Sequence, residues 1–100
     1  MNLSKTSVNK TIIIFVEGGI DSSNSAQFES FIRKEIKDYE EIVFDLNKCE
    51  YISSAGLRVI LKVCKYLNGV GEVSVINASE SVRSVLEMTG FTKVMKVETK

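Results

Sequence analysis

Residues 42–67 of this 100-residue chain read IVFDLNKCEYISSAGLRVILKVCKYL, and the rest of the fold can be worked out from them. The opening part, Ile42 to Leu46, is short, apolar and β-branched, which predicts a buried strand. The closing part predicts a helix, because its apolar residues recur at spacings of three and four, at Leu57, Ile60, Leu61, Cys64 and Leu67. A polar elbow joins the two parts, so the segment predicts a strand followed by a helix.

Two adjacent serines stand where the predicted helix begins. Ser53 or Ser54 is a natural N-cap, because a serine oxygen can accept a hydrogen bond from an unpaired amide of the first turn. Ala55 and Gly56 make that turn small, so its amides should be approachable, and the helix dipole favours negative charge there. A plain serine cap is the commonest use of this pattern. The other interpretation is a hydroxyl presented at an electropositive helix start.

The composition is that of one ordinary globular domain spanning residues 1–100, with 44% apolar and 26% charged residues. Thirteen basic and thirteen acidic side chains cancel, so there is no electrostatic case for a nucleic-acid partner. No apolar run approaches the roughly 20 residues that a membrane span needs. The N-terminus also lacks the apolar core of a signal peptide. We therefore expect a cytoplasmic protein.

The sequence contains no histidine, which removes the usual general base and the commonest metal ligand. It also has no glycine-rich phosphate loop and no Gly-x-Ser-x-Gly elbow. An enzyme that uses Ser54 as its nucleophile is therefore the weaker hypothesis, and we expect no catalytic residue, metal or cofactor. Cys49 in the polar elbow should be partly exposed and Cys64 should lie in the core, both as free thiols.

Strand and helix patterns alternate along the rest of the chain. Strands are expected at residues 2–8, 11–16, 42–46, 72–76 and 94–98, and helices at residues 25–37, 57–67 and 79–89. The first two strands should form an antiparallel hairpin, and Ser79 and Gly90 should cap the ends of the last helix. The order β-β-α-β-α-β-α-β predicts an α/β domain: a small mixed sheet with helices packed on it and right-handed parallel crossovers.

Two aspartates lie near the ends of predicted strands. Asp21 follows the second strand, and locally it would form an Asx-turn or a cap ahead of the next helix. Asp45 lies inside the apolar strand that ends at Leu46. A carboxylate that ties down the following loop is the simplest interpretation of its position.

Residues 51–61, YISSAGLRVIL, resemble the signature of the anti-sigma factor antagonists, the bacterial members of the STAS domain family. That signature is an aspartate or serine, a phosphorylatable serine, a small residue and then Gly-Leu opening a helix. Ser54 matches the regulated serine and Ser53 is the runner-up, although many members have aspartate at the position of Ser53. Residues 19–21 and 81–91 resemble two further segments of the family. The resemblance therefore covers essentially the whole chain and implies the STAS fold.

The resemblance implies a regulatory binding module. Unphosphorylated, the protein would bind an anti-sigma factor that is also a serine kinase and thereby free the sigma factor. The kinase would phosphorylate Ser54 with ATP, and a separate serine phosphatase would reset it. The partner surface would include Asp21, Asp45, Ser53, Ser54, Ala55, Gly56 and Arg58. A monomer or weak dimer is expected, and the alternative function is a subunit or regulator of a transporter or another non-sigma pathway.

Overall fold

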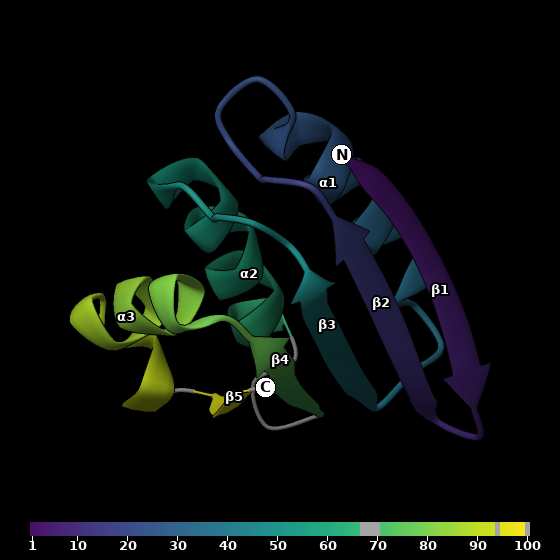
Figure 1. Cartoon of the computed structure of the whole chain (residues 1–100). Helices are drawn as coiled ribbons and strands as arrows, with labels where there is room; N and C mark the ends of the chain where they lie inside the picture. The colour runs from purple at the N-terminus through teal and green to yellow at the C-terminus, as the bar shows by residue number, and fades with distance from the viewer. Residues whose placement is uncertain (67–70, 94, 100) are drawn as a thin grey trace.

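The computed structural model describes residues 1–66, 71–93 and 95–99, and it contains one five-stranded sheet with three helices (Figure 1). The strands are β1 (Asn2–Val8), β2 (Thr11–Glu17), β3 (Glu41–Lys48), β4 (Glu72–Ala78) and β5 (Lys96–Thr99). The helices are α1 (Ser25–Glu35), α2 (Ser54–Tyr66), α3 (Glu80–Met88) and the short 3₁₀ helix η1 (Phe91–Lys93). Among these described helices, none is long and apolar enough to cross a membrane.

The strands lie side by side in chain order, from β1 at the right of Figure 1 to β5 at the lower left. β1 and β2 form the predicted antiparallel hairpin, and Asn9 takes a positive φ of 54° in its turn. β2, β3, β4 and β5 are all parallel, which confirms the predicted mixed sheet. Because these strands point the same way, the loops that leave β2 and β3 lie at one edge of the sheet.

The core lies between one face of the sheet and the helices. Alternate residues of the central strands β2 and β3 are fully or almost fully buried: Ile12, Ile14, Val16, Ile42, Phe44 and Leu46. From α1, Phe28 packs on Phe44 with ring centroids 5.9 Å apart and ring planes at 58°, a tilted arrangement that aromatic pairs favour. On the opposite face the positions are more open, and Phe15 is 37% exposed. The helices therefore cover the face of the sheet that carries Phe44.

Several helices and strands begin or end at residues other than those predicted. α1 ends at Glu35 and not at Lys37, because the backbone leaves the helix at Ile36, whose amide makes the last helical bond to Ile32. β5 begins at Lys96, later than predicted, because the chain first makes the 3₁₀ helix η1. The predicted start of that strand at residue 94 and the predicted helix end at residue 67 lie outside the described residues.

Candidate functional site at the start of α2

The two serines before α2 have different roles. Ser53 is the N-cap: its Oγ accepts a hydrogen bond from the Gly56 amide at 3.4 Å, and its carbonyl accepts one from the Leu57 amide at 3.0 Å. Ser54 is the first helical residue and is exposed. In the described part of the chain, the Ser54 hydroxyl makes no hydrogen bond, and the amides of Ser54 and Ala55 have no protein acceptor. The helix start thus offers a free hydroxyl beside unpaired donors.

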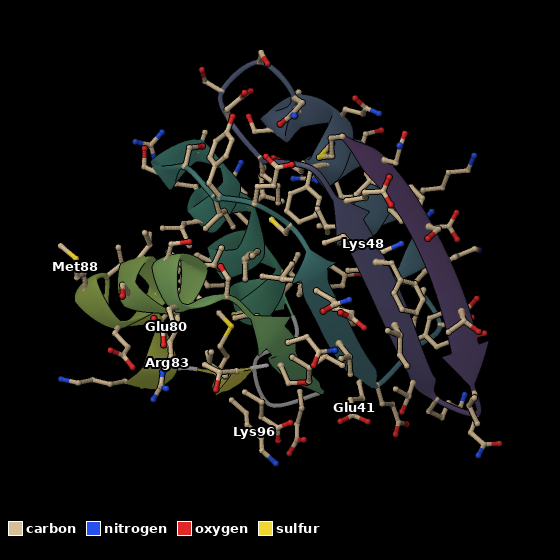
Figure 2. The ribbon with its side chains drawn as sticks, viewed as in Figure 1. Glu41, Lys48, Glu80, Arg83, Met88 and Lys96 are labelled. Carbon is tan, nitrogen blue, oxygen red and sulfur yellow. The ribbon has the colours of Figure 1, made fainter. Side chains whose placement is uncertain are left out.

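The loop after β2 and the loop after β3 are joined by four backbone hydrogen bonds, which we call the loop ladder. They link Gly18 to Lys48 (labelled in Figure 2) and Glu50 at 2.9 and 3.2 Å, and Ile20 to Tyr51 and Ser53 at 3.0 and 2.8 Å. A bridge between Ile20 and Ile52 continues the parallel pairing of the two strands. The ladder ends at the N-cap of α2, so the Asp21 loop lies against the segment that carries Ser54.

Tyr51 crosses this ladder and holds Asp21. Its hydroxyl donates a hydrogen bond to Asp21 Oδ2 at 2.8 Å, while Asp21 Oδ1 accepts from the Ser23 amide at 2.8 Å. The tyrosine ring lies directly over Gly19, where a Cβ atom would be only 2.1 Å from ring atom Cε1. The bond from Ser23 confirms the Asx-turn predicted for Asp21. Tyr51 was not selected from the sequence, because nothing local connects it to a residue thirty positions earlier.

These contacts fix the charge of Asp21. Hydrogen bonds from the Ser23 side chain, from Tyr51 and from the Ser23 backbone lower the pKa of the Asp21 carboxyl below its usual value. The same bond to Asp21, followed by partial burial, raises the pKa of the Tyr51 phenol. Asp21 is therefore ionised at neutral pH, and a negative charge is held in place next to the segment that carries Ser54.

Replacing Tyr51 by Phe should raise the pKa of the Asp21 carboxyl toward its ordinary value, since one hydrogen bond to the ionised form is lost. Ionised Asp21 stabilises the fold at pH values above the pKa that its carboxyl has in the unfolded chain. This contribution is lost as the pH falls through the lower pKa that the carboxyl has in the folded protein. As the pH falls through the Asp21 titration, Tyr51→Phe should therefore lose less stability than the unsubstituted protein does. Carboxyl carbon shifts followed by NMR across this range measure the pKa directly.

Tyr66→Phe is the matched control for this measurement, because Tyr66 is 69% exposed at the far end of α2. It should leave the Asp21 titration unchanged. An unaltered Asp21 titration in Tyr51→Phe would show that, in solution, the Tyr51 phenol does not donate a hydrogen bond to the Asp21 carboxylate.

Asp45 points away from the face of the sheet that the helices cover. It lies on β3 between Phe44 and Leu46, which face the helices, so its side chain points to the opposite face of the sheet. Its Oδ1 accepts hydrogen bonds from the Asn47 amide at 3.0 Å and from the Asn77 side chain at 3.3 Å. The simpler interpretation, a carboxylate that ties down the following loop, is confirmed. The place of Asp45 in the partner surface, which the resemblance implies, stays a prediction.

Gly56 faces the core. It is buried, and a Cβ atom there would lie 2.7 Å from Ile20 Cγ2 and 2.9 Å from Ile52 Cγ1. The expectation that Gly56 contributes to an accessible surface is therefore wrong, since its lack of a side chain serves packing under the loop ladder. Ala55 is half-buried and Arg58 is exposed on the outer side of α2.

Cys49 is buried where partial exposure was expected, whereas Cys64 packs against the core as expected but is only half-buried. Cys49 is only 3% exposed, because the chain turns inward where the Cys49 amide bonds to the Leu46 carbonyl at 3.0 Å. Its thiol donates to the Tyr51 carbonyl at 3.3 Å, and burial raises its pKa. Cys64 is half-buried against the core. Both are free thiols as predicted, but the polar neighbours of Cys49 gave a misleading indication of exposure.

Comparison with known sequences gives one family. The family model described as the STAS domain matches residues 2–100. BtrV of Bordetella bronchiseptica, named as a candidate anti-sigma factor antagonist, is 35% identical over 99 residues, covering 97% of this chain and 85% of its own. The anti-sigma F factor antagonist of Paenibacillus polymyxa is 30% identical over 91 residues, covering 86% of this chain and 76% of its own.

Comparison with solved structures gives the same fold. The unphosphorylated form of the anti-sigma factor antagonist SpoIIAA matches with a TM-score of 0.83 at 22% identity, over 99% of this chain and 90% of that one. The phosphorylated form of SpoIIAA from Bacillus matches with a TM-score of 0.75 at 21% identity, over 99% and 93% of the two chains. These likenesses confirm the STAS-type architecture expected from the sequence.

Proposed function

This chain belongs to the STAS domain family, among the anti-sigma factor antagonists, and from that membership we propose that it acts in a partner-switching circuit. In its unphosphorylated form it binds an anti-sigma factor that is also a serine kinase, and this releases the sigma factor. Phosphorylation of Ser54 ends the binding, and a separate serine phosphatase restores it. The protein works in the cytoplasm, where the sigma factor acts.

The observation that carries this proposal is the exposed hydroxyl of Ser54, which makes no hydrogen bond within the described chain and stands at the first position of α2. A kinase can reach this oxygen without unfolding the helix. Ser54 Oγ would attack the γ-phosphorus of ATP, so that the new oxygen–phosphorus bond forms as the bond to ADP breaks. The hydroxyl proton would pass to a base of the kinase.

Charge explains how phosphate would act as the switch. A phosphoserine adds roughly −1.5 to −2 charges at neutral pH. Asp21 already places one negative charge on the adjoining loop, held there by Tyr51. A partner that brings its own carboxylates to this surface would be repelled, and like charges brought together at an interface cost several kcal/mol. The fold itself tolerates the phosphate, because the positive end of α2 favours negative charge.

Ser54, and not Ser53, is expected to carry the phosphate. Ser53 is half-buried and its Oγ caps the helix, whereas the Ser54 hydroxyl is exposed. Fragment mass spectrometry after incubation with the cognate kinase and ATP locates the modified residue. Ser54→Ala should abolish labelling, whereas Ser53→Ala should lose about 1 kcal/mol of helix capping and still be labelled. Phosphate found on Ser53 alone would overturn the assignment.

A further inference from the structure

Arg58 lies one helical turn after Ser54 on the outer face of α2. Side chains four residues apart on a helix are neighbours, and both of these residues are exposed while Leu57 and Val59 are buried. Among the residues that the structure describes, Arg58 makes no ion pair. On the next turn Lys62 differs, because Glu29 of α1 holds its ammonium at 3.2 Å. Arg58 is thus a cation whose position matches that of Ser54 and which nothing described neutralises.

A phosphate on Ser54 would meet two kinds of hydrogen-bond donor and the positive end of the helix dipole. The amides of Ser54 and Ala55 have no acceptor in the described chain, and the positive end of the helix dipole lies at the same place. A guanidinium group binds phosphate through two parallel hydrogen bonds, which a lysine ammonium cannot do. The separation between Ser54 and Arg58 is the one at which oppositely charged side chains pair on a helix surface.

We infer that Arg58 binds the phosphate of phosphorylated Ser54 and that this contact is part of the switch. The inference rests on the proposed function, since it assigns a second role to the modification of Ser54. Before phosphorylation, the Arg58 guanidinium is available to a carboxylate of the partner. Afterwards it is occupied by the phosphate on its own helix. Phosphorylation then removes a cation from the docking surface at the same time as it adds negative charge.

Among the residues that the structure describes, Asp21 and Glu50 at the loop ladder and Lys62 on the following turn also place charges near this helix start. Asp21 and Glu50 oppose the second ionisation of the phosphate, whereas Arg58 and Lys62 favour it. Asp21 and Glu50 are the same in every variant considered below. A difference in the second pKa of the phosphate between variants therefore reports the effect of the cation that was removed.

The test is a titration of the phosphate itself. Phosphoserine is placed at position 54 during translation, so that no kinase is needed, and the second pKa of the phosphate is followed by ³¹P NMR. Arg58→Gln should raise this pKa by about half a unit relative to the unsubstituted phosphoprotein, since the dianion loses a charged partner. Lys62→Gln removes a cation one turn farther away and should change it by less than about 0.2.

Equal phosphate titrations in Arg58→Gln and the unsubstituted phosphoprotein would overturn the inference. An equal rise in Arg58→Gln and Lys62→Gln would overturn it as well, because it would indicate the general field of α2 and no specific contact. Failure of the proposed function has a different signature. It would appear as a kinase that leaves Ser54 unmodified, or as a phosphoprotein that binds its partner as well as the unmodified protein does, and neither result alters the titration.

Discussion

Phosphorylation of Ser54 is expected to weaken binding of the anti-sigma factor about a hundredfold or more while the domain stays folded. The loss follows from several kcal/mol of like-charge repulsion at the docking surface, where the Asp21 carboxylate is already fixed. Isothermal titration of the purified partner with the modified and unmodified proteins measures it. Thermal unfolding of the two forms should agree closely, because negative charge at a helix start is favourable by about 0.3–1 kcal/mol.

Substitutions separate the effect of charge from the effect of the hydroxyl. Ser54→Ala should bind normally and become insensitive to ATP, whereas Ser54→Asp should bind weakly. Its loss should be smaller than that caused by phosphate, because aspartate carries one charge and fewer acceptor oxygens. Ser84→Asp, at an exposed position of α3, is the matched control and should bind normally. A phosphoprotein with a much lower melting temperature would contradict a local electrostatic switch and indicate unfolding of the start of α2.

Gly56→Leu should destabilise the domain by about 1–3 kcal/mol, the usual range for an overpacked core. A Cβ atom at this position would lie within 3 Å of Ile20 and Ile52, and both are buried beneath the loop ladder, at 0% and 5% exposure. A side chain at position 56 therefore requires these two neighbours to shift. Urea unfolding measures this loss in the free energy of unfolding. The rate of Ser54 phosphorylation should also fall, because the start of α2 is distorted.

Arg58→Leu is the control, because it introduces a leucine into the same helix at an exposed position. It shows whether leucine at any position of α2 causes the loss of stability expected for Gly56→Leu. It should unfold at nearly the same urea concentration as the unsubstituted protein. If Gly56→Leu proved as stable as the unsubstituted protein but was phosphorylated slowly, the glycine would act by keeping Ser54 accessible, and the packing explanation would be wrong.

The features that could be predicted from the sequence are those with local signals. The β-branched run of β2 and the apolar segment of β3 give strands, because their side chains fit a buried, pleated surface. The last helix has its predicted ends, since Ser79 Oγ accepts from the Val82 amide at 3.3 Å and Gly90 takes a φ of 79°. Capping and turn chemistry involve only neighbouring residues, so the sequence contains all of the necessary information.

The features that could not be predicted depend on register between distant segments. The bond between Tyr51 and Asp21 exists only because the loop ladder pairs the two loops in one particular alignment. The inward orientation of Gly56 depends on where Ile20 lies, and that position is set by the same ladder. The alternation of Asp45 with Phe44 and Leu46 is visible in the sequence, but which face of the sheet the helices leave open depends on packing between distant segments.

The loop ladder consists of backbone atoms alone, so its shape does not depend on which side chains its outward positions carry. Under the proposed function, a bacterium with several such regulators must prevent each of them from being phosphorylated by the wrong kinase. Such insulation can evolve by exchange of exposed residues such as Ser22 and Glu50 on an unchanged frame, with little effect on folding. Under the same proposal, we expect that orthogonal pairs of kinase and regulator could be selected from libraries at these positions.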